Sequence, residues 1–401
     1  MKIKSLSFNN YKAFLNQQTI EIRPITVLIG KNSSGKSSIA KLFTLLENSL
    51  SRNIKEPLLY NNNGVVIGGE FRDLVFNRQP SVPVSFSILF EDDSRIKIEI
   101  LSPNNDYNLI INSWELISND FNAVVTYSPS LGVYIDQHGK ILKCQFSGFL
   151  PDFLLNEDGS EVIPKEFFDK YSIIVDYIGP FRIIPDRQFQ LDGKLSHSKT
   201  GVKGEFAYPI LATSELANKE LEGSVGDWFK KYFNGWGIKV NHQNRPFFEV
   251  VLEKDDIEVN IVDVGQGINQ VLPLIVRSFI PSNDTLVIIE QPELHLHPAA
   301  HADLAELFAK SALNFNQNFL IETHSENFIL RLRKLIVAND FGLKPEDVVI
   351  YWIDDADIGQ EITEITIDGN GKLTDWPSGV FNENLDEILQ IKKAIKNKSI
   401  I

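Results

Sequence analysis

Cysteine is almost absent from this sequence, since Cys144 is the single thiol among 401 residues. One cysteine excludes an internal disulfide, a cysteine-based zinc site and an iron–sulfur cluster, because each of these needs several thiols. Long apolar runs are absent as well, and none approaches the 18 or more residues that cross a membrane. The first 18 residues lack the apolar core of a signal peptide. These absences predict a soluble, cytoplasmic protein without a membrane partner.

Positive charge is also scarce: the chain has 39 lysines and arginines and 53 aspartates and glutamates, which gives a net charge of −14. Such a chain gains no bulk attraction to DNA, RNA or an anionic membrane. A nucleic-acid contact would need a local patch, and residues 1–50 show such a bias, with seven basic residues against two glutamates. Four lysines near the C-terminus are expected to form a solvated face: Lys392, Lys393, Lys396 and Lys398. The charge therefore does not support nucleic-acid binding.

The sequence contains neither an internal repeat nor a heptad run long enough for a coiled-coil arm. Residues 64–175 alternate apolar and polar positions between turn signals, which predicts a mostly antiparallel region. The last 140 residues alternate apolar strands with helical patterns, which predicts a mostly parallel sheet covered by helices. The predicted class is α/β. The predicted parts are 1–79 with the first half of the main domain, a β-rich insertion 80–165, a helical and β subdomain 166–260, and the second half 261–401.

A phosphate-binding loop follows the apolar run at 25–29. The segment from Gly30 to Ser37, GKNSSGKS, fits the P-loop pattern and lies between a predicted strand and a predicted helix. Its backbone N–H groups and the helix N-terminus favour phosphate, Lys36 would reach the β- and γ-phosphates, and Ser37 would ligate Mg²⁺. A plain Gly/Ser turn is the alternative. The predicted nucleotide-binding residues here are Gly30, Asn32, Ser33, Ser34, Gly35, Lys36, Ser37 and Ser38.

An acidic strand end is predicted 254 residues after Lys36, where the apolar run 286–289 ends at Glu290. In phosphate-transferring proteins such an acid holds the Mg²⁺ shell, and the alternative is a residue that merely ends a buried strand. Gln291 comes next, and it could orient a water molecule but cannot accept its proton at neutral pH. Glu293 could substitute for it. We predict catalytic roles for Lys36, Glu290, Gln291 and His324.

Two further motifs complete the set. Gly265, Gln266 and Gly267 open a predicted helix and could clamp a γ-phosphate with bare N–H groups, although a plain helix start is the alternative. His324 follows the predicted strand 318–322 and could donate a hydrogen bond to the γ-phosphate, with a structural histidine as the alternative. Arg182 could contact phosphate or a partner, with a solvated surface position or a structural ion pair as the alternatives. A zinc site at Glu293 and the nearby histidines is disfavoured by its spacing: His295, His297 and His301.

The order and spacing of these motifs resemble the ATP-binding-cassette class of ATPases. Within it, the chain resembles the SMC/RecF-like branch that includes OLD-family nucleases, and more closely the standalone bacterial AAA-type ATPases often found in phage-defence loci. Four segments carry the resemblance: 177–182, 263–267, 290–298 and 322–325. They read YIGPFR, DVGQG, EQPELHLHP and ETHS.

The resemblance implies a P-loop ATPase head that uses ATP and Mg²⁺ and forms a homodimer or higher oligomer. Two ATPs would lie between the P-loop of one subunit and Gly265–Gly267 of the other. It implies control of a separately encoded effector protein, a nuclease, in anti-phage defence, because the roughly 34 residues after Ile367 are too few for a nuclease domain. Related heads contact the adenine at positions matching Asn9, Tyr11 and Lys12.

The chain departs from this class at Gln291, where the class usually has a glutamate that polarises the attacking water. Slow ATP hydrolysis is therefore expected. Two alternatives remain open. One is a weakly hydrolysing, nucleotide-dependent scaffold, which Gln291 favours, and the other is a RecF-like DNA-repair ATPase, against which the net charge argues.

Overall fold

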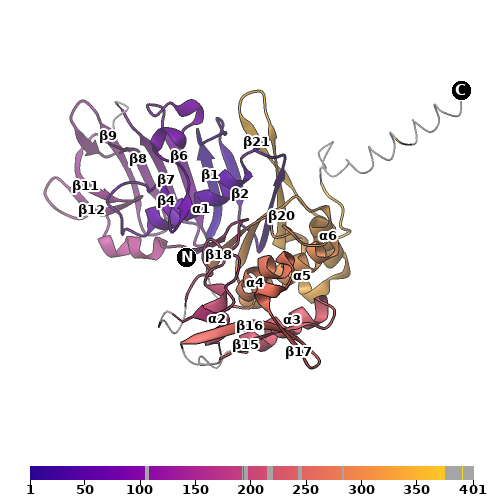
Figure 1. The fold of residues 1–401 in the computed structure, drawn as a ribbon. Helices are drawn as coiled ribbons and strands as arrows, with labels where there is room; N and C mark the ends of the chain where they lie inside the picture. Colours follow the sequence, from indigo (N-terminus) through magenta and orange to yellow (C-terminus); the bar gives the residue numbers. More distant parts are fainter. Residues whose placement is uncertain are drawn as a thin grey trace, which may run out of the picture.

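The computed structural model describes residues 1–103, 108–191, 193, 197–214, 220–242, 246–281, 284–374 and 391. The four lysines near the C-terminus lie outside these residues. Two large sheets share one helix, α1 (Lys36–Leu50), which lies between them (Figure 1). Among the described residues, no helix is both long and apolar enough to cross a bilayer.

The first sheet is antiparallel throughout and has nine strands in the order β12-β11-β10-β9-β8-β7-β6-β1-β2. Its strands are β1 (Ile3–Asn9), β2 (Gln18–Glu21), β6 (Val84–Phe90), β7 (Arg95–Leu101), β8 (Ile110–Ile117), β9 (Asn122–Ser128), β10 (Val133–Ile135), β11 (Ile141–Ser147) and β12 (Leu150–Asn156). The predicted antiparallel region is confirmed. The predicted division into four parts stays a prediction, and this sheet joins strands from the first two of those parts.

The second sheet has the order β13-β18-β19-β3-β20-β21, and all neighbours are parallel except β20 and β21. Its strands are β3 (Ile25–Gly30), β13 (Ile174–Ile178), β18 (Thr285–Glu290), β19 (Asn318–Glu322), β20 (Val348–Asp355) and β21 (Gln360–Ile365). This mostly parallel sheet confirms the alternating strand and helix pattern of the sequence. The carboxyl ends of β3, β13, β18 and β19 meet at one edge.

Helices and a small sheet cover the far face of the parallel sheet (Figure 1). The helices are α2 (Ala207–Thr213), α3 (Leu221–Tyr232), α4 (Gln266–Ser278), α5 (Pro298–Phe315) and α6 (Glu326–Ala338). The small sheet holds β14 (Phe189–Gln190), β15 (Gly237–Asn241), β16 (Phe247–Lys254) and β17 (Ile257–Asn260), and a short hairpin joins β4 (Asn61–Asn62) to β5 (Val65–Val66).

Strands β3, β18, β19 and β20 are mostly apolar and are buried at almost every position, because both faces of their sheet are covered. Alternate residues of β3 show this, since Leu28 packs on the side of α1 whereas Val27 and Ile29 pack on the side of α4, α5 and α6. The same alternation runs through β18, β19 and β20. Packing on both faces of the sheet therefore explains why the sequence of these strands shows continuous apolar runs.

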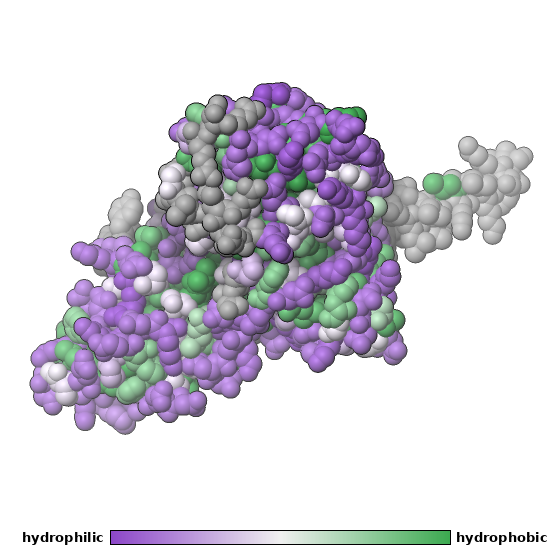
Figure 2. Space-filling model, turned by 90° about the horizontal axis from the view of Figure 1, so that it is seen from below, coloured by the Kyte–Doolittle hydropathy of each residue, from purple (hydrophilic) through white to green (hydrophobic). Residues whose placement is uncertain are grey.

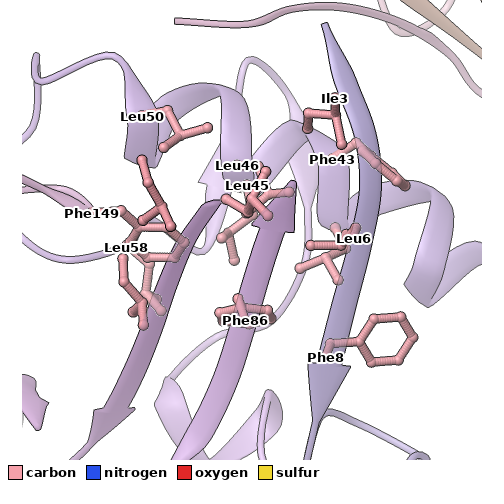
Figure 3. Close-up of a cluster of buried hydrophobic side chains, with 14 of the residues drawn as sticks. Ile3, Leu6, Phe8, Phe43, Leu45, Leu46, Leu50, Leu58, Phe86 and Phe149 are labelled. Carbon is pink, nitrogen blue, oxygen red and sulfur yellow. The ribbon is translucent and has the colours of Figure 1, made fainter. Parts of the chain in front are cut away.

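Helix α1 buries its apolar side against the antiparallel sheet. Figure 3 shows leucines and a phenylalanine of α1 pointing toward side chains of β1 and β6, and all of them lie in one buried cluster. The labelled members are Ile3, Leu6, Phe8, Phe43, Leu45, Leu46, Leu50, Leu58, Phe86 and Phe149. This packing fixes α1, and with it the loop that precedes the helix. The face drawn in Figure 2 is mainly hydrophilic, with hydrophobic residues in small groups.

Candidate nucleotide-binding site

The loop between β3 and α1 has the backbone geometry that its glycines predict. Gly35 has a φ of 101°, and a Cβ there would lie 3.0 Å from the ring of Phe14. A Cβ on Gly30 would lie 2.4 Å from the carbonyl oxygen of Ile353 on β20. Any larger residue at either position would therefore displace its neighbours. Ser33 also adopts a positive φ, of 64°.

Lys36 is buried at the start of α1, and its ammonium group points back into the loop. It donates hydrogen bonds to the carbonyl oxygens of Gly30 at 2.9 Å and Lys31 at 2.6 Å. Burial lowers the pKa of Lys36, and the carboxylates of Glu322 and Glu290 partly offset this. The lysine predicted to reach phosphate thus lies inside the loop, close to both acids.

The Ser37 hydroxyl contacts an acid that was not among the predicted site residues. It donates to Glu322 Oε2 at 2.7 Å. The strand order explains this contact, because β19 lies between β3 and β18 and its last residue is therefore nearer to the P-loop than Glu290 is. Glu322 and Glu290 are directly opposite in the pairing of β19 with β18. The sequence signal was present, because both strands end in glutamate, but the sequence does not give the strand order.

Glu290 lies at the buried carboxyl end of β18, as predicted. The Tyr177 hydroxyl on β13 donates to its Oε1 at 2.6 Å. Burial and, after it, the charge of the neighbouring Glu322 raise the pKa of Glu290 to about 7. Burial likewise raises the pKa of Glu322. Two carboxylates and a hydroxyl at one place are oxygen ligands of the kind that Mg²⁺ prefers, and a bound cation would remove the repulsion between the acids.

Gln291 and Arg182 meet directly after β18. Gln291 has a φ of 46°, and its N–H donates to the carbonyl oxygen of Glu322 at 2.8 Å. Arg182 is 5% exposed, and its Nη2 donates to the carbonyl oxygens of Glu290 at 2.8 Å and Gln291 at 3.3 Å. Arg182 therefore contacts backbone, and it is neither a solvated residue nor a member of an ion pair among the described residues.

His324 lies between β19 and α6, in the loop that faces the P-loop. Its backbone N–H donates to Glu293 Oε1 at 2.6 Å, which links the loops after β18 and β19. His324 is exposed to solvent, yet desolvation and the charge of Lys36 lower the pKa of its imidazole. The ring is therefore neutral at physiological pH and can donate one hydrogen bond without adding a charge.

The segment from Gly265 to Gly267 starts α4, as predicted, with no side chain capping it. A Cβ on Gly265 would meet no atom within 4 Å, whereas one on Gly267 would lie 2.8 Å from the carbonyl oxygen of His295. The start of α4 therefore rests on the loop that follows Glu290. Gly265 itself faces open space within this chain.

Two histidines that follow Glu290 and the tyrosine near the P-loop form hydrogen bonds that stabilise local structure. The ring of His297 accepts from the N–H of Ala299 at the start of α5, and His301 pairs with the Ser325 hydroxyl at 2.9 Å. No group of three or more histidine, cysteine, aspartate or glutamate side chains that could hold a metal occurs in the described part of the chain. Tyr11 is fully buried and donates to the carbonyl oxygen of Ser38, so its ring is part of the core.

The fold and this site define a P-loop ATPase head. The model of the AAA ATPase domain family matches residues 1–147 and 190–329, which is more than half of the chain, and the chain therefore belongs to this family of nucleotide-dependent ATPases. Residues 343–391 match a second family, described as a protein of unknown function (DUF3696). No curated protein matches the chain at a significant level.

Solved structures of SMC heads are similar to the chain. The SMC head bound to the C-winged helix domain of ScpA has a TM-score of 0.52 and 14% identity, and the match covers 91% of this chain and 98% of that one. The SMC head domain from Thermotoga maritima has a TM-score of 0.44 and 12% identity, covering 90% and 98%. An SMC head with an extended coiled coil from Pyrococcus furiosus, bound to the C-terminal domain of ScpA, has a TM-score of 0.45 and 12% identity. That match covers 98% of this chain and 99% of the other. The first similarity confirms the predicted α/β ATPase head fold.

Proposed function

We propose that this chain is an Mg²⁺-dependent ATPase head that works as a molecular switch. The observation that carries the proposal is the convergence of Lys36, Ser37, Glu290 and Glu322 at the carboxyl edge of the parallel sheet. The P-loop N–H groups, from Gly30 to Ser38, would hold the phosphates of ATP. Lys36 would exchange its two carbonyl acceptors for the β- and γ-phosphates.

Ser37, Glu290 and Glu322 would hold the Mg²⁺ ion, which neutralises phosphate charge. The Ser37 oxygen would face the cation while its O–H still donates a hydrogen bond to Glu322, so that Glu322 orients the hydroxyl. Tyr177 would keep Glu290 in place through its 2.6 Å hydrogen bond. His324 would donate to the γ-phosphate from the neighbouring loop.

Glu322→Gln tests this arrangement. We expect it to raise the Mg²⁺ concentration for half-maximal binding of a fluorescent ATP analogue by about tenfold, because the amide still accepts from Ser37 but has no charge for the cation. Glu326→Gln is the matched control, since it removes an exposed carboxylate four residues further along and should change nothing. An unchanged Mg²⁺ dependence in Glu322→Gln would contradict the role.

The switch would operate through association of two copies. Gly265 faces open space in its own chain, and the N–H groups at the start of α4 are uncapped, as a clamp for the γ-phosphate of ATP held by a second copy requires. Gly265, Gln266 and Gly267 would then contact that phosphate. ATP would join the two copies, and hydrolysis would release them.

Gln291 would position the attacking water without accepting its proton, so hydrolysis would be slow and the ATP-bound dimer long-lived. This residue also favours the second candidate, a nucleotide-dependent scaffold with little turnover.

Gln291→Glu separates the two candidates when turnover and light scattering are measured together. If the chain is a switch, we expect ATP to double the molar mass measured by light scattering. We also expect the variant to raise ATP turnover at least about tenfold, because a carboxylate can accept the proton of the water. Gln79→Glu adds the same charge at an exposed position that is not among the predicted site residues, and it is the control. Association without turnover in both proteins would establish the scaffold, and neither association nor turnover would contradict both.

The partner would be a separately encoded effector, and the resemblance to OLD-family and phage-defence ATPases points to a nuclease in anti-phage defence. The structure of an SMC head bound to ScpA is an instance of a head of this fold that binds a protein. A plaque assay on cells that express this chain with its genomic neighbours, wild type against Lys36→Ala, tests the defence role. Equal plaque numbers for cells with and without the genes would contradict it.

A further inference from the structure

The backbone of Gln291 is held in a conformation that this residue does not favour by itself. A φ of 46° lies in the left-handed region, where the Cβ of a non-glycine residue crowds the following carbonyl oxygen. Contacts impose it: the Gln291 N–H donates to the carbonyl oxygen of Glu322, and Arg182 donates to the carbonyl oxygens of Glu290 and Gln291, on either side of the Gln291 Cα. The direction of the Gln291 side chain therefore depends on where Arg182 lies.

Arg182 is a costly way to stabilise a fold. Its guanidinium is buried, burial lowers its pKa to about 10, and it still carries its charge at neutral pH. Its Nε and Nη1 find no hydrogen-bond partner among the residues that the structure describes. Desolvation of a charged group that has no ion-pair partner disfavours folding. The buried position of Arg182 therefore indicates a role other than stabilising the fold.

Helix α4 is attached to this arginine. The Arg182 N–H donates to Gln270 Oε1 at 3.4 Å, and Gln270 Nε2 donates to the Arg182 carbonyl oxygen at 3.3 Å. Gln270 lies five residues after Gly265, in the first turns of the same helix. The far end of α4 is held much more firmly, by a fully buried ion pair of Arg277 with Asp176 at 2.8 Å. The start of α4 is thus the end that can be displaced.

We infer that Gln270 and Arg182 are positioning residues that pass a displacement at the start of α4 to Gln291. The source of that displacement rests on the proposed function, because it is the contact of the start of α4 with the γ-phosphate of ATP bound to a second copy. Gln270 moves with the helix, Arg182 follows Gln270, and the two carbonyl oxygens follow Arg182. Each site of the dimer then hydrolyses ATP only when its own α4 is engaged.

A double-mutant cycle tests the route. We expect Gln270→Ala to lower kcat about tenfold and to leave the dissociation constant of a fluorescent ATP analogue within twofold, because the water is misplaced while the P-loop is intact. In a Gln291→Ala background, Gln270→Ala should cause no further loss. An equal loss in both backgrounds, or no loss in the wild-type background, would overturn the inference.

Amide hydrogen exchange gives a readout that needs no turnover. Gln270→Ala and Arg182→Lys should both speed exchange of the Gln291 N–H, since a lysine cannot bridge two carbonyl oxygens as the planar guanidinium does. Arg52→Ala is the matched control, because Arg52 also donates to two backbone carbonyl oxygens but lies against Asp152, Lys165 and Asp169. Unchanged exchange at Gln291 would overturn the coupling even if the protein hydrolyses ATP. Failure of the wild type to bind ATP would instead contradict the proposed function.

Discussion

Lys36→Ala is expected to abolish ATP turnover, with a loss of at least about 100-fold, and to weaken ATP binding by about 10- to 100-fold. A hydrogen bond to a charged group contributes about 1.5–3 kcal/mol, which gives the loss of affinity. The larger effect on turnover follows because the same ammonium group faces the charge that develops on the transferred phosphate. Phosphate release and titration with a fluorescent ATP analogue measure the two effects.

Lys31→Ala is the matched control for this variant. Lys31 belongs to the same loop, but its side chain is exposed and is paired with Asp354 at 3.0 Å. Its removal should change turnover less than about threefold, because an exposed ion pair stabilises the loop only weakly. Equal losses in the two variants would show that the loop responds to any loss of charge and that Lys36 has no special role.

Arg277→Met is expected to lower the free energy of unfolding by about 3–5 kcal/mol, the largest stability effect that we foresee. Arg277 and Asp176 are each 1% exposed, and their ion pair joins α4 to β13. Removing the arginine leaves the Asp176 carboxylate buried with hydrogen bonds from Thr200. Those bonds satisfy some of its oxygens but do not neutralise its charge. Denaturation by guanidinium chloride, followed by tryptophan fluorescence, measures the change.

Two further variants test this explanation. Arg277→Met combined with Asp176→Asn should be more stable than Arg277→Met alone, because asparagine keeps an acceptor for Thr200 without a charge. Arg187→Met removes an exposed arginine that forms an ion pair with Asp263 and should change the free energy of unfolding little, because water screens this pair. If Arg277→Met lowers the free energy of unfolding no more than Arg187→Met does, the buried ion pair does not stabilise the packing of α4 against the sheet.

Local features of the site could be predicted from the sequence because they depend on neighbouring residues. A Gly-rich loop between an apolar strand and a helix allows few backbone conformations, and Gly30, Gly35 and Lys36 lie as that pattern requires. The apolar runs ending at Glu290 and Glu322 identified buried parallel strands. The position of His324 between strand and helix followed from the same periodicity.

Contacts between distant segments could not be predicted in this way. The bond from Ser37 to Glu322 depends on β19 lying between β3 and β18, which is a property of the sheet and not of any one strand. Arg182 was left open between a phosphate contact, a partner contact and a structural ion pair, whereas the structure places it on the carbonyl oxygens of Glu290 and Gln291.

By itself, then, the sequence determined the loop, the strand ends and the helix starts, because dihedral preferences and burial patterns act over a few residues. Only the tertiary structure decided which carboxylate meets Ser37 and which helix is attached to Arg182. The physical reason is that a hydrogen bond of about 3 Å needs two atoms brought together by packing, and Ser37 and Glu322 are 285 residues apart in the chain. Strand order and helix placement determine which distant residues come into contact, and both arise from the burial of apolar faces over the whole domain.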